Sequence, residues 1–214
     1  MITLRSNGTP LLSTSRLDEL SRGRSGLDWA VLTGWPRGRR VGRVARVSTW
    51  TTPERPEPPY NPIDERTALE DRLEFHRTTL LLKCGGLTPE QLALRSVPPS
   101  TLSLLGLVRH LSGVEAWFHS YDGQPDHMYF WDYVPGSTEG CDEVDITRAA
   151  DDLASYKASV ARSREAVTGR SLDEASPGED YTLRWIYLHM IEEYARHNGH
   201  ADFIRERIDG ATGE

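Results

Sequence analysis

The strongest constraint on the fold of this chain is a set of polar residues inside the apolar stripe of its last helical segment, residues 182–209. At about 100° per residue, Glu193, His197 and His200 lie within about 80° of His189 around an α-helix. The apolar residues on the same arc are Ile186, Met190, Ile204 and Ile208. Because a helix buries such an arc against its neighbours, the carboxylate and the three imidazoles are predicted to need polar partners inside the fold.

A divalent metal ion would meet that need. Burying polar groups without partners costs about 2–7 kcal/mol for each group. A cation removes this cost because it binds neutral imidazole nitrogen and carboxylate oxygen directly. His189 and His197 lie about 12 Å apart along the helix axis, so they cannot both reach one ion with bonds of about 2 Å. The helix is therefore predicted to supply two ligands four residues apart, and another element must supply a third.

His110 is the best third ligand that the sequence offers. It lies in the apolar stripe of a predicted helix over residues 103–121, on the same face as Leu107, Val114 and Trp117. Three protein ligands leave positions open for water or substrate, which is typical of a catalytic site. The alternative is that these residues are hydrogen-bonded polar groups in a helix interface that holds no ion.

Hydrophobic periodicity predicts an all-α chain with four long helices. Their approximate ranges are 64–84, 103–121, 146–168 and 182–209, with a short helix opening at Thr88. Residues 122–144 between the second and third long helices are predicted to form a long, ordered loop, and loops of that length are often functional. This pattern predicts a four-helix bundle.

The chain is predicted to have three parts. Residues 63–214 form the bundle, and residues 47–62 are a proline-rich lead-in. Residues 1–46 are rich in Gly, Ser and Arg, which predicts either a disordered extension or a misannotated start, with Val47 as the true first residue.

Charge and cysteine content narrow the function classes. Residues 1–46 carry nine arginines and three acidic residues, and with −7 for the whole chain this leaves −13 on residues 47–214. Such an acidic body argues against nucleic acid or an anionic membrane as partner. No apolar run is long enough to cross a bilayer, and two cysteines fit a reducing compartment. A cytoplasmic protein is the resulting expectation.

Two segments resemble a known family. The run His-Met-Ile-Glu-Glu-Tyr-Ala-Arg-His-Asn-Gly-His-Ala-Asp at 189–202, with Leu-Gly-Leu-Val-Arg-His-Leu at 105–111, resembles the DinB-like (DinB/YfiT-like) metalloprotein superfamily. More narrowly, it is similar to an actinobacterial branch related to mycothiol-dependent enzymes. The resemblance covers about residues 50–214 and leaves out residues 1–46.

The resemblance implies a bundle in up-down-down-up order that binds zinc or nickel. Carried over residue by residue, it implies that His110, Glu193 and His197 are the metal ligands. Common members continue after the last ligand with Arg-Gly-Gln, whereas this chain has Asn198-Gly199-His200. The family pattern therefore leaves the role of His200 open.

The resemblance also implies chemistry with a low-molecular-weight thiol, such as mycothiol or bacillithiol, and an electrophilic substrate. A metal ion lowers the pKa of a thiol bound to it, which agrees with that chemistry. The expected function is a divalent-metal-dependent S-transferase or isomerase. His189 and His200 are then candidate catalytic residues, acting as proton carriers or orienting the ligands.

Two other functions remain open at this point. The chain could be a non-catalytic stress-response or scaffold protein whose ion holds the helices together, or a hydrolase that uses a metal-bound water. A homodimer is compatible with each of these functions. His76 and Cys84 are predicted to face the bundle interior, where a buried core role is the simpler interpretation of both.

Overall fold

The structure is a computed structural model, and its described residues are 50–119, 141–142, 144–177 and 180–213. Within them the chain forms helices and no named strand, which confirms the all-α prediction. The helices are α1 (Glu65–Cys84), α2 (Pro89–Leu92), α3 (Leu104–His119), the 3-10 helix η4 (Ile146–Arg148), α4 (Ala149–Ala166) and α5 (Leu183–Asp209). Residues 1–49 lie outside this description, so the predicted boundaries of the three parts stay predictions.

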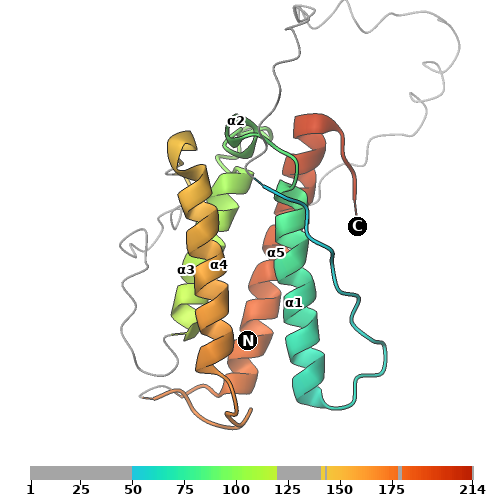
Figure 1. Cartoon of the computed structure of the whole chain (residues 1–214), viewed down its shortest axis with the longest axis vertical. Coiled ribbons are helices and arrows are strands. Elements are labelled where there is room, and N and C mark those ends of the chain that lie inside the picture. Colours follow the sequence, from blue (N-terminus) through green and yellow to red (C-terminus); the bar gives the residue numbers. More distant parts are fainter. Residues whose placement is uncertain (1–49, 120–140, 143, 178–179, 214) are drawn as a thin grey trace, which may run out of the picture. The chain divides into compact units, whose positions relative to one another are not determined.

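The four long helices lie side by side, with α1 packed along α5 and α3 packed along α4 and α5 (Figure 1). Helices α1 and α5 begin at the same end of the bundle, where Arg184 binds Glu65. Helices α3 and α4 begin at the opposite end, where Arg109 binds Asp152. As a result α1 and α5 run in one direction and α3 and α4 in the other. In the described residues, no helix is both long and apolar enough to span a bilayer.

Local sequence signals set where most of these helices begin and end. The Asp64 side chain accepts a hydrogen bond from the Thr67 amide at 2.9 Å and caps α1. Thr182 caps α5 in the same way, and Gly210 ends it with a positive φ of 79°. The predicted third helix differs from its expected range, because Asp145 caps a 3-10 turn and the α-helix itself spans only Ala149–Ala166.

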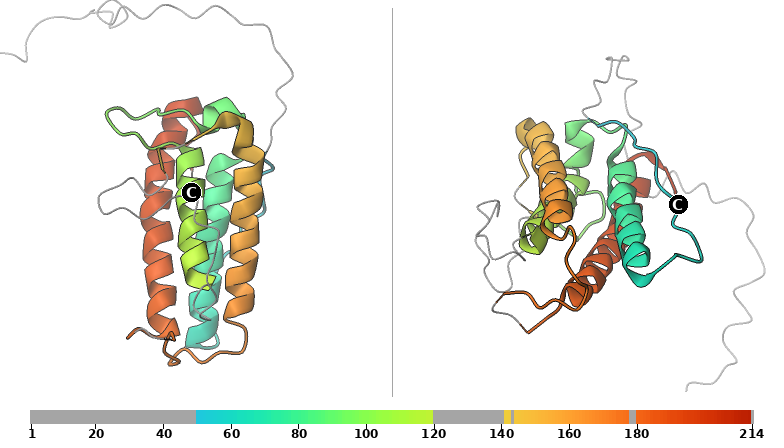
Figure 2. Two further views of the ribbon diagram at one scale, coloured as in Figure 1. Left: turned by 90° about the vertical axis from the view of Figure 1, so that its left-hand side faces the viewer. Right: turned by 60° about the horizontal axis from the view of Figure 1, so that its bottom comes forward.

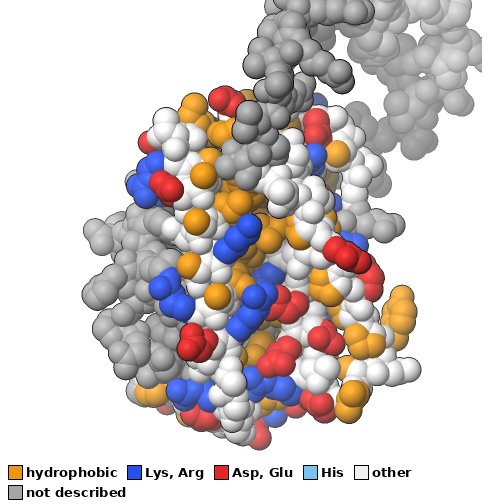
Figure 3. Space-filling model, viewed as in Figure 1, with side chains coloured by type: hydrophobic (Ala, Val, Ile, Leu, Met, Phe, Trp, Pro, Cys, Tyr) orange, Lys and Arg blue, Asp and Glu red, His pale blue; other side chains and the backbone are white. Residues whose placement is uncertain are grey.

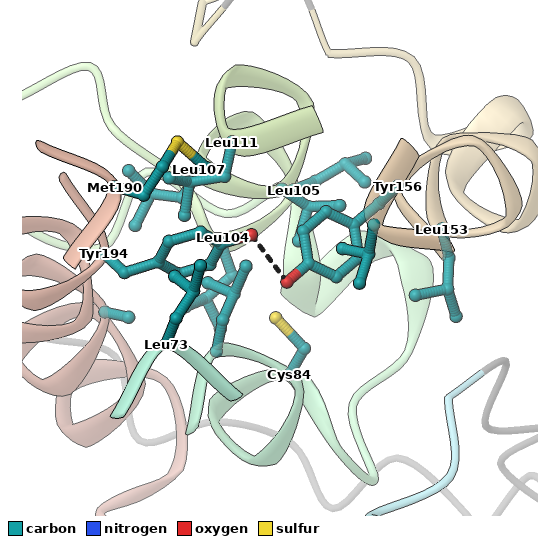
Figure 4. Packing of buried hydrophobic residues seen from close by; sticks show 14 of the residues in the cluster. Leu73, Cys84, Leu104, Leu105, Leu107, Leu111, Leu153, Tyr156, Met190 and Tyr194 are labelled. Atoms are coloured by element: carbon teal, nitrogen blue, oxygen red, sulfur yellow. Dashed lines mark hydrogen bonds between the residues drawn. The ribbon is translucent and has the colours of Figure 1, made fainter. Parts of the chain in front are cut away.

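The core is built mainly from leucines and aromatic residues contributed by all four long helices (Figure 4). Trp50, which precedes the predicted bundle boundary, is also buried in this core. Gly106 lets the backbone of Cys141 lie against the first turn of α3, since a Cβ at this position would be 2.1 Å from the Cys141 carbonyl oxygen. The close packing of the Cys141 backbone on α3 therefore depends on a glycine here.

A buried polar network crosses the middle of the core. The Arg77 guanidinium on α1 donates two hydrogen bonds of 2.7 Å to the Glu115 carboxylate on α3. The Tyr194 hydroxyl donates to the same carboxylate at 2.6 Å and lies 2.9 Å from the Tyr156 hydroxyl (Figure 4). Burial and the nearby Glu115 charge raise the pKa of both tyrosines, so both hydroxyl groups keep their protons. This network joins α1, α3, α4 and α5.

Between α1 and α4 the surface is hollowed, and apolar side chains with basic groups beside them are visible there (Figure 3). A pocket of about 310 Å³ is lined by Leu81, Tyr156 and Val160 together with Glu74 and Arg164. Burial by itself would raise the pKa of Glu74. The hydrogen bonds from Arg164 and the charge of Arg77 lower it by more, so the pKa of Glu74 lies below its ordinary value. None of the residues that were predicted to bind metal lines this pocket.

Candidate metal centre

Three predicted ligands meet in the seam between α3 and α5. Glu193 and His197 are one turn apart on α5 and point from the same face. His110 lies near the middle of α3, which runs antiparallel to α5 and beside it (Figure 2). The pairing of α3 with α5 thus brings one imidazole opposite a carboxylate and a second imidazole.

The donor atoms of these three side chains converge. Glu193 Oε2 lies 3.5 Å from His110 Nε2 and 3.4 Å from His197 Nε2. All three donor atoms lie within 4.8 Å of one another. Among the described residues, this is the group of three His, Cys, Asp or Glu side chains whose donor atoms could hold a metal ion. The two imidazole rings have centroids 4.5 Å apart and are tilted by 57°. Two nitrogens and one oxygen are therefore aimed at one small volume.

This arrangement fits a divalent ion. Two ligands of a tetrahedral ion with bonds of about 2.0–2.2 Å lie about 3.3–3.6 Å apart. The 3.4 and 3.5 Å separations from Glu193 match that spacing without any movement of the helices. Two imidazoles and a carboxylate suit zinc, nickel, iron or manganese, so the donor set alone selects no single metal.

The electrostatics favour an ionised carboxylate at the centre of the group. Hydrogen-bonded contacts with His110 and His197 outweigh the effect of burial and hold the pKa of Glu193 well below its ordinary value. The side chains of Glu193 and His197 are 15% and 12% exposed, whereas His110 is 6% exposed. The two α5 members of the group are thus partly exposed, and His110 is buried.

The two predicted catalytic histidines lie on either side of this group along α5. His200 Nδ1 is 3.4 Å from His197 Nδ1, the nitrogen that does not face Glu193. His189 lies one turn before Glu193, with its ring stacked on Trp185 at 5.0 Å and edge-on to Trp117 at 5.4 Å. Neither histidine belongs to the three-residue group, and their catalytic role stays a prediction.

The other residues singled out in the sequence lie apart from the group. His76 is half-buried, and its carbonyl oxygen accepts a hydrogen bond of 3.0 Å from the side chain of Asn198. Burial raises the pKa of Cys84 to about 12, which agrees with an inert core cysteine. The predicted loop over residues 122–144 lies for the most part outside the described residues.

Sequence reasoning missed the buried pair of Arg77 and Glu115. Glu115 stands between Val114 and Ala116 in an apolar stretch, which was the available signal, whereas both neighbours of Arg77 in the sequence are polar. Glu115 follows His110 by five residues, and its partner Tyr194 follows Glu193 directly, so the network fixes α3 and α5 close to the donor atoms.

Comparison with known proteins agrees with this geometry. The family model described as mycothiol-S-transferase matches residues 68–210, about two-thirds of the chain, and this span contains all three converging residues. Searches of curated proteins and of solved structures each returned no match. The family match confirms the resemblance to DinB-like proteins related to mycothiol enzymes, and the chain belongs to the mycothiol-S-transferase family.

Proposed function

We propose that this protein is a divalent-metal-dependent enzyme that transfers a low-molecular-weight thiol of the mycothiol type to an electrophilic carbon. The observation that carries the proposal is the convergence of His110, Glu193 and His197 in a chain of this family. A metal ion held by these residues would supply a positive charge that lowers the pKa of a thiol bound beside it. Zinc and nickel are the proposed metals.

The side chains of the group have distinct tasks in this proposal. The ionised Glu193 carboxylate offsets part of the charge of the metal and offers an oxygen ligand. With an ion bound, His110 and His197 would offer unprotonated Nε2 atoms in place of the Nε2–H groups that hydrogen-bond Glu193 without it, which requires their protons to sit on Nδ1. His200 then acts as a positioning residue, because its Nδ1 can accept the Nδ1 proton of His197 across 3.4 Å and so fix the ring and its tautomer.

Thiol transfer also requires a place for the thiol proton. The S–H bond breaks, a bond forms between sulfur and the electrophilic carbon, and the proton leaves with the displaced group or returns to the product. We propose His189 as the group that takes up this proton, since it lies one turn from Glu193 along α5. The stacked ring of Trp185 holds its imidazole in place.

The test is thiol transfer by the purified full chain loaded with zinc or nickel. Mycothiol is supplied as the thiol and a small alkylating reagent with a fluorescent thioether product as the electrophile. We expect turnover that falls by at least about a hundredfold in His197→Ala. His76→Ala is the matched control and should keep its turnover, because His76 contacts none of the three residues. A loaded protein that consumes no thiol, or equal loss in both variants, would overturn the proposal.

A further inference from the structure

The pocket between α1 and α4 exists because these two helices pack mainly on other partners. Helix α1 lies along α5 and α4 lies along α3, whereas the backbones of α1 and α4 barely approach one another in the described residues. The hollow that remains has a volume of about 310 Å³ and reaches the surface (Figure 3). Small-molecule sites have volumes of about 300–1,000 Å³, so this pocket has room for a small ligand.

The pocket is elongated along the helix axes. Its lining runs from Glu74 to Leu81 on α1, which is about 10 Å, and from Tyr156 to Arg164 on α4, which is about 12 Å. Because α1 and α4 run antiparallel, Glu74 and Arg164 lie at the same end, where the Arg164 Nε–H donates to the Glu74 carboxylate at 2.9 Å. This ion pair therefore bounds one end of a slot about 10–12 Å long.

Part of the lining is apolar. Tyr156 is 1% exposed and Val160 is 6% exposed, and both side chains border the pocket together with Leu81. An apolar surface of this kind gains free energy when it is covered by hydrocarbon instead of water. The pocket is therefore suited to a ligand with an apolar body.

The polar part of the lining has more donors than acceptors. Among the described residues that line the pocket, Glu74 supplies the carboxylate, and it already accepts hydrogen bonds from Arg77 and Arg164. The Thr78 hydroxyl and the Lys157 ammonium make no side-chain hydrogen bond or ion pair in the described part of the chain. Three cations thus line the pocket against one carboxylate, although the chain as a whole carries −7. This local excess of positive charge favours an anionic ligand.

We propose that this pocket binds a medium-chain monocarboxylate. The carboxylate accepts hydrogen bonds from Lys157 and Thr78, and the hydrocarbon chain lies along the apolar part of the lining. An extended chain gains about 1.2 Å per single bond, so a slot of about 10–12 Å takes about eight to ten carbons. The inference does not depend on the metal or on thiol transfer, because the pocket is lined by α1 and α4 and the three converging residues belong to α3 and α5.

Isothermal titration calorimetry of the full chain with octanoate is the first test. We expect a Kd of about 0.1–1 mM, with 1-octanol and octylammonium at least about tenfold weaker. Lys157→Met should weaken octanoate binding by about fivefold and leave 1-octanol binding unchanged. Arg162→Met is the matched control: Arg162 is exposed on the same helix and carries the same charge but does not line the pocket, so octanoate affinity should stay within about twofold. Circular dichroism checks that both variants fold.

The length of the ligand and the removal of metal supply the second test. From hexanoate to decanoate the affinity should rise by about fourfold per CH₂ group, and it should level off at dodecanoate because the slot is then filled. Octanoate affinity should be the same before and after dialysis against a chelator. Equal binding to Lys157→Met and Arg162→Met, or no binding up to about 10 mM octanoate, would overturn the proposal. So would affinity that keeps rising beyond decanoate, which indicates unspecific adsorption, or binding that is lost with the metal, which places the carboxylate on the ion.

Discussion

Removing Arg77 should be among the most damaging single changes outside the candidate metal centre. The Glu115 carboxylate is fully buried and accepts three hydrogen bonds, two of 2.7 Å from Arg77 and one of 2.6 Å from Tyr194. In Arg77→Met the Glu115 carboxylate keeps only the hydrogen bond from the Tyr194 hydroxyl. Stranding one member of a buried ion pair costs about 3–5 kcal/mol. A domain with about 5–15 kcal/mol of total stability would lose a large part of it.

Urea unfolding followed by circular dichroism measures this loss. With an m-value of about 2 kcal/mol/M, the midpoint should fall by about 1.5–2.5 M. Arg164→Met is the control, because Arg164 pairs with Glu74 from a side chain that is 56% exposed, and it should cost about 1 kcal/mol or less. The double variant Arg77→Met with Glu115→Leu should recover at least about 2 kcal/mol, since no charge is left stranded. A loss below about 1 kcal/mol for Arg77→Met alone would refute the reasoning.

Three further predictions concern other parts of the fold. Glu74→Gln should destabilise the protein by about 1 kcal/mol at neutral pH. Because folding lowers the pKa of Glu74, the difference should shrink as the pH falls from the ordinary glutamate range toward the lowered pKa of the folded state. Gly106→Ala should lower the free energy of unfolding by at least about 2 kcal/mol, because the new methyl group meets the Cys141 carbonyl. His200→Ala should weaken metal binding by about 10–100-fold while leaving the fold intact, as chelator competition would show.

Each of these predictions has a clear contrary result. A stability difference for Glu74→Gln that stays the same as the pH is lowered from neutral into the acid range would exclude the ionised carboxylate as its cause. Gly199→Ala, measured at low protein concentration, is the control for Gly106→Ala and should gain about 0.5–1 kcal/mol, because nothing occupies the space around it. Metal affinity unchanged in His200→Ala would remove His200 from the account of the site.

Local patterns were sufficient to predict most of the fold. Helix caps such as Asp64, Thr182 and Gly210 act within a few residues of themselves, so the sequence alone specifies them. The third helix was drawn too long at its start because an Asp cap is equally compatible with a 3-10 turn, which is what Asp145 begins here.

The converging group was predictable because two of its members are four residues apart on one apolar stripe and His110 lies in the apolar stripe of another helix. The resemblance to DinB-like proteins then implied Glu193 and His197 as the pair of ligands. The pair of Arg77 and Glu115 was not predictable in the same way. The two residues are 38 positions apart, and periodicity says which side of a helix faces inward without saying which charges meet there. His76 shows the same limit. Periodicity placed it in the apolar stripe of its helix, but did not indicate that its carbonyl oxygen would accept a hydrogen bond from Asn198.

The central claim is that His110, Glu193 and His197 hold one divalent ion, and neighbouring glutamates on α5 allow its most direct test. Zinc or nickel bound per chain is measured by mass spectrometry after dialysis for the wild type, Glu193→Gln and Glu192→Gln. Glu192 is exposed and turned away from the group, so its variant is the matched control. We predict about one ion per chain in the wild type and in Glu192→Gln, and a large loss in Glu193→Gln. Equal metal content in all three proteins, or no ion in any of them, would contradict the claim.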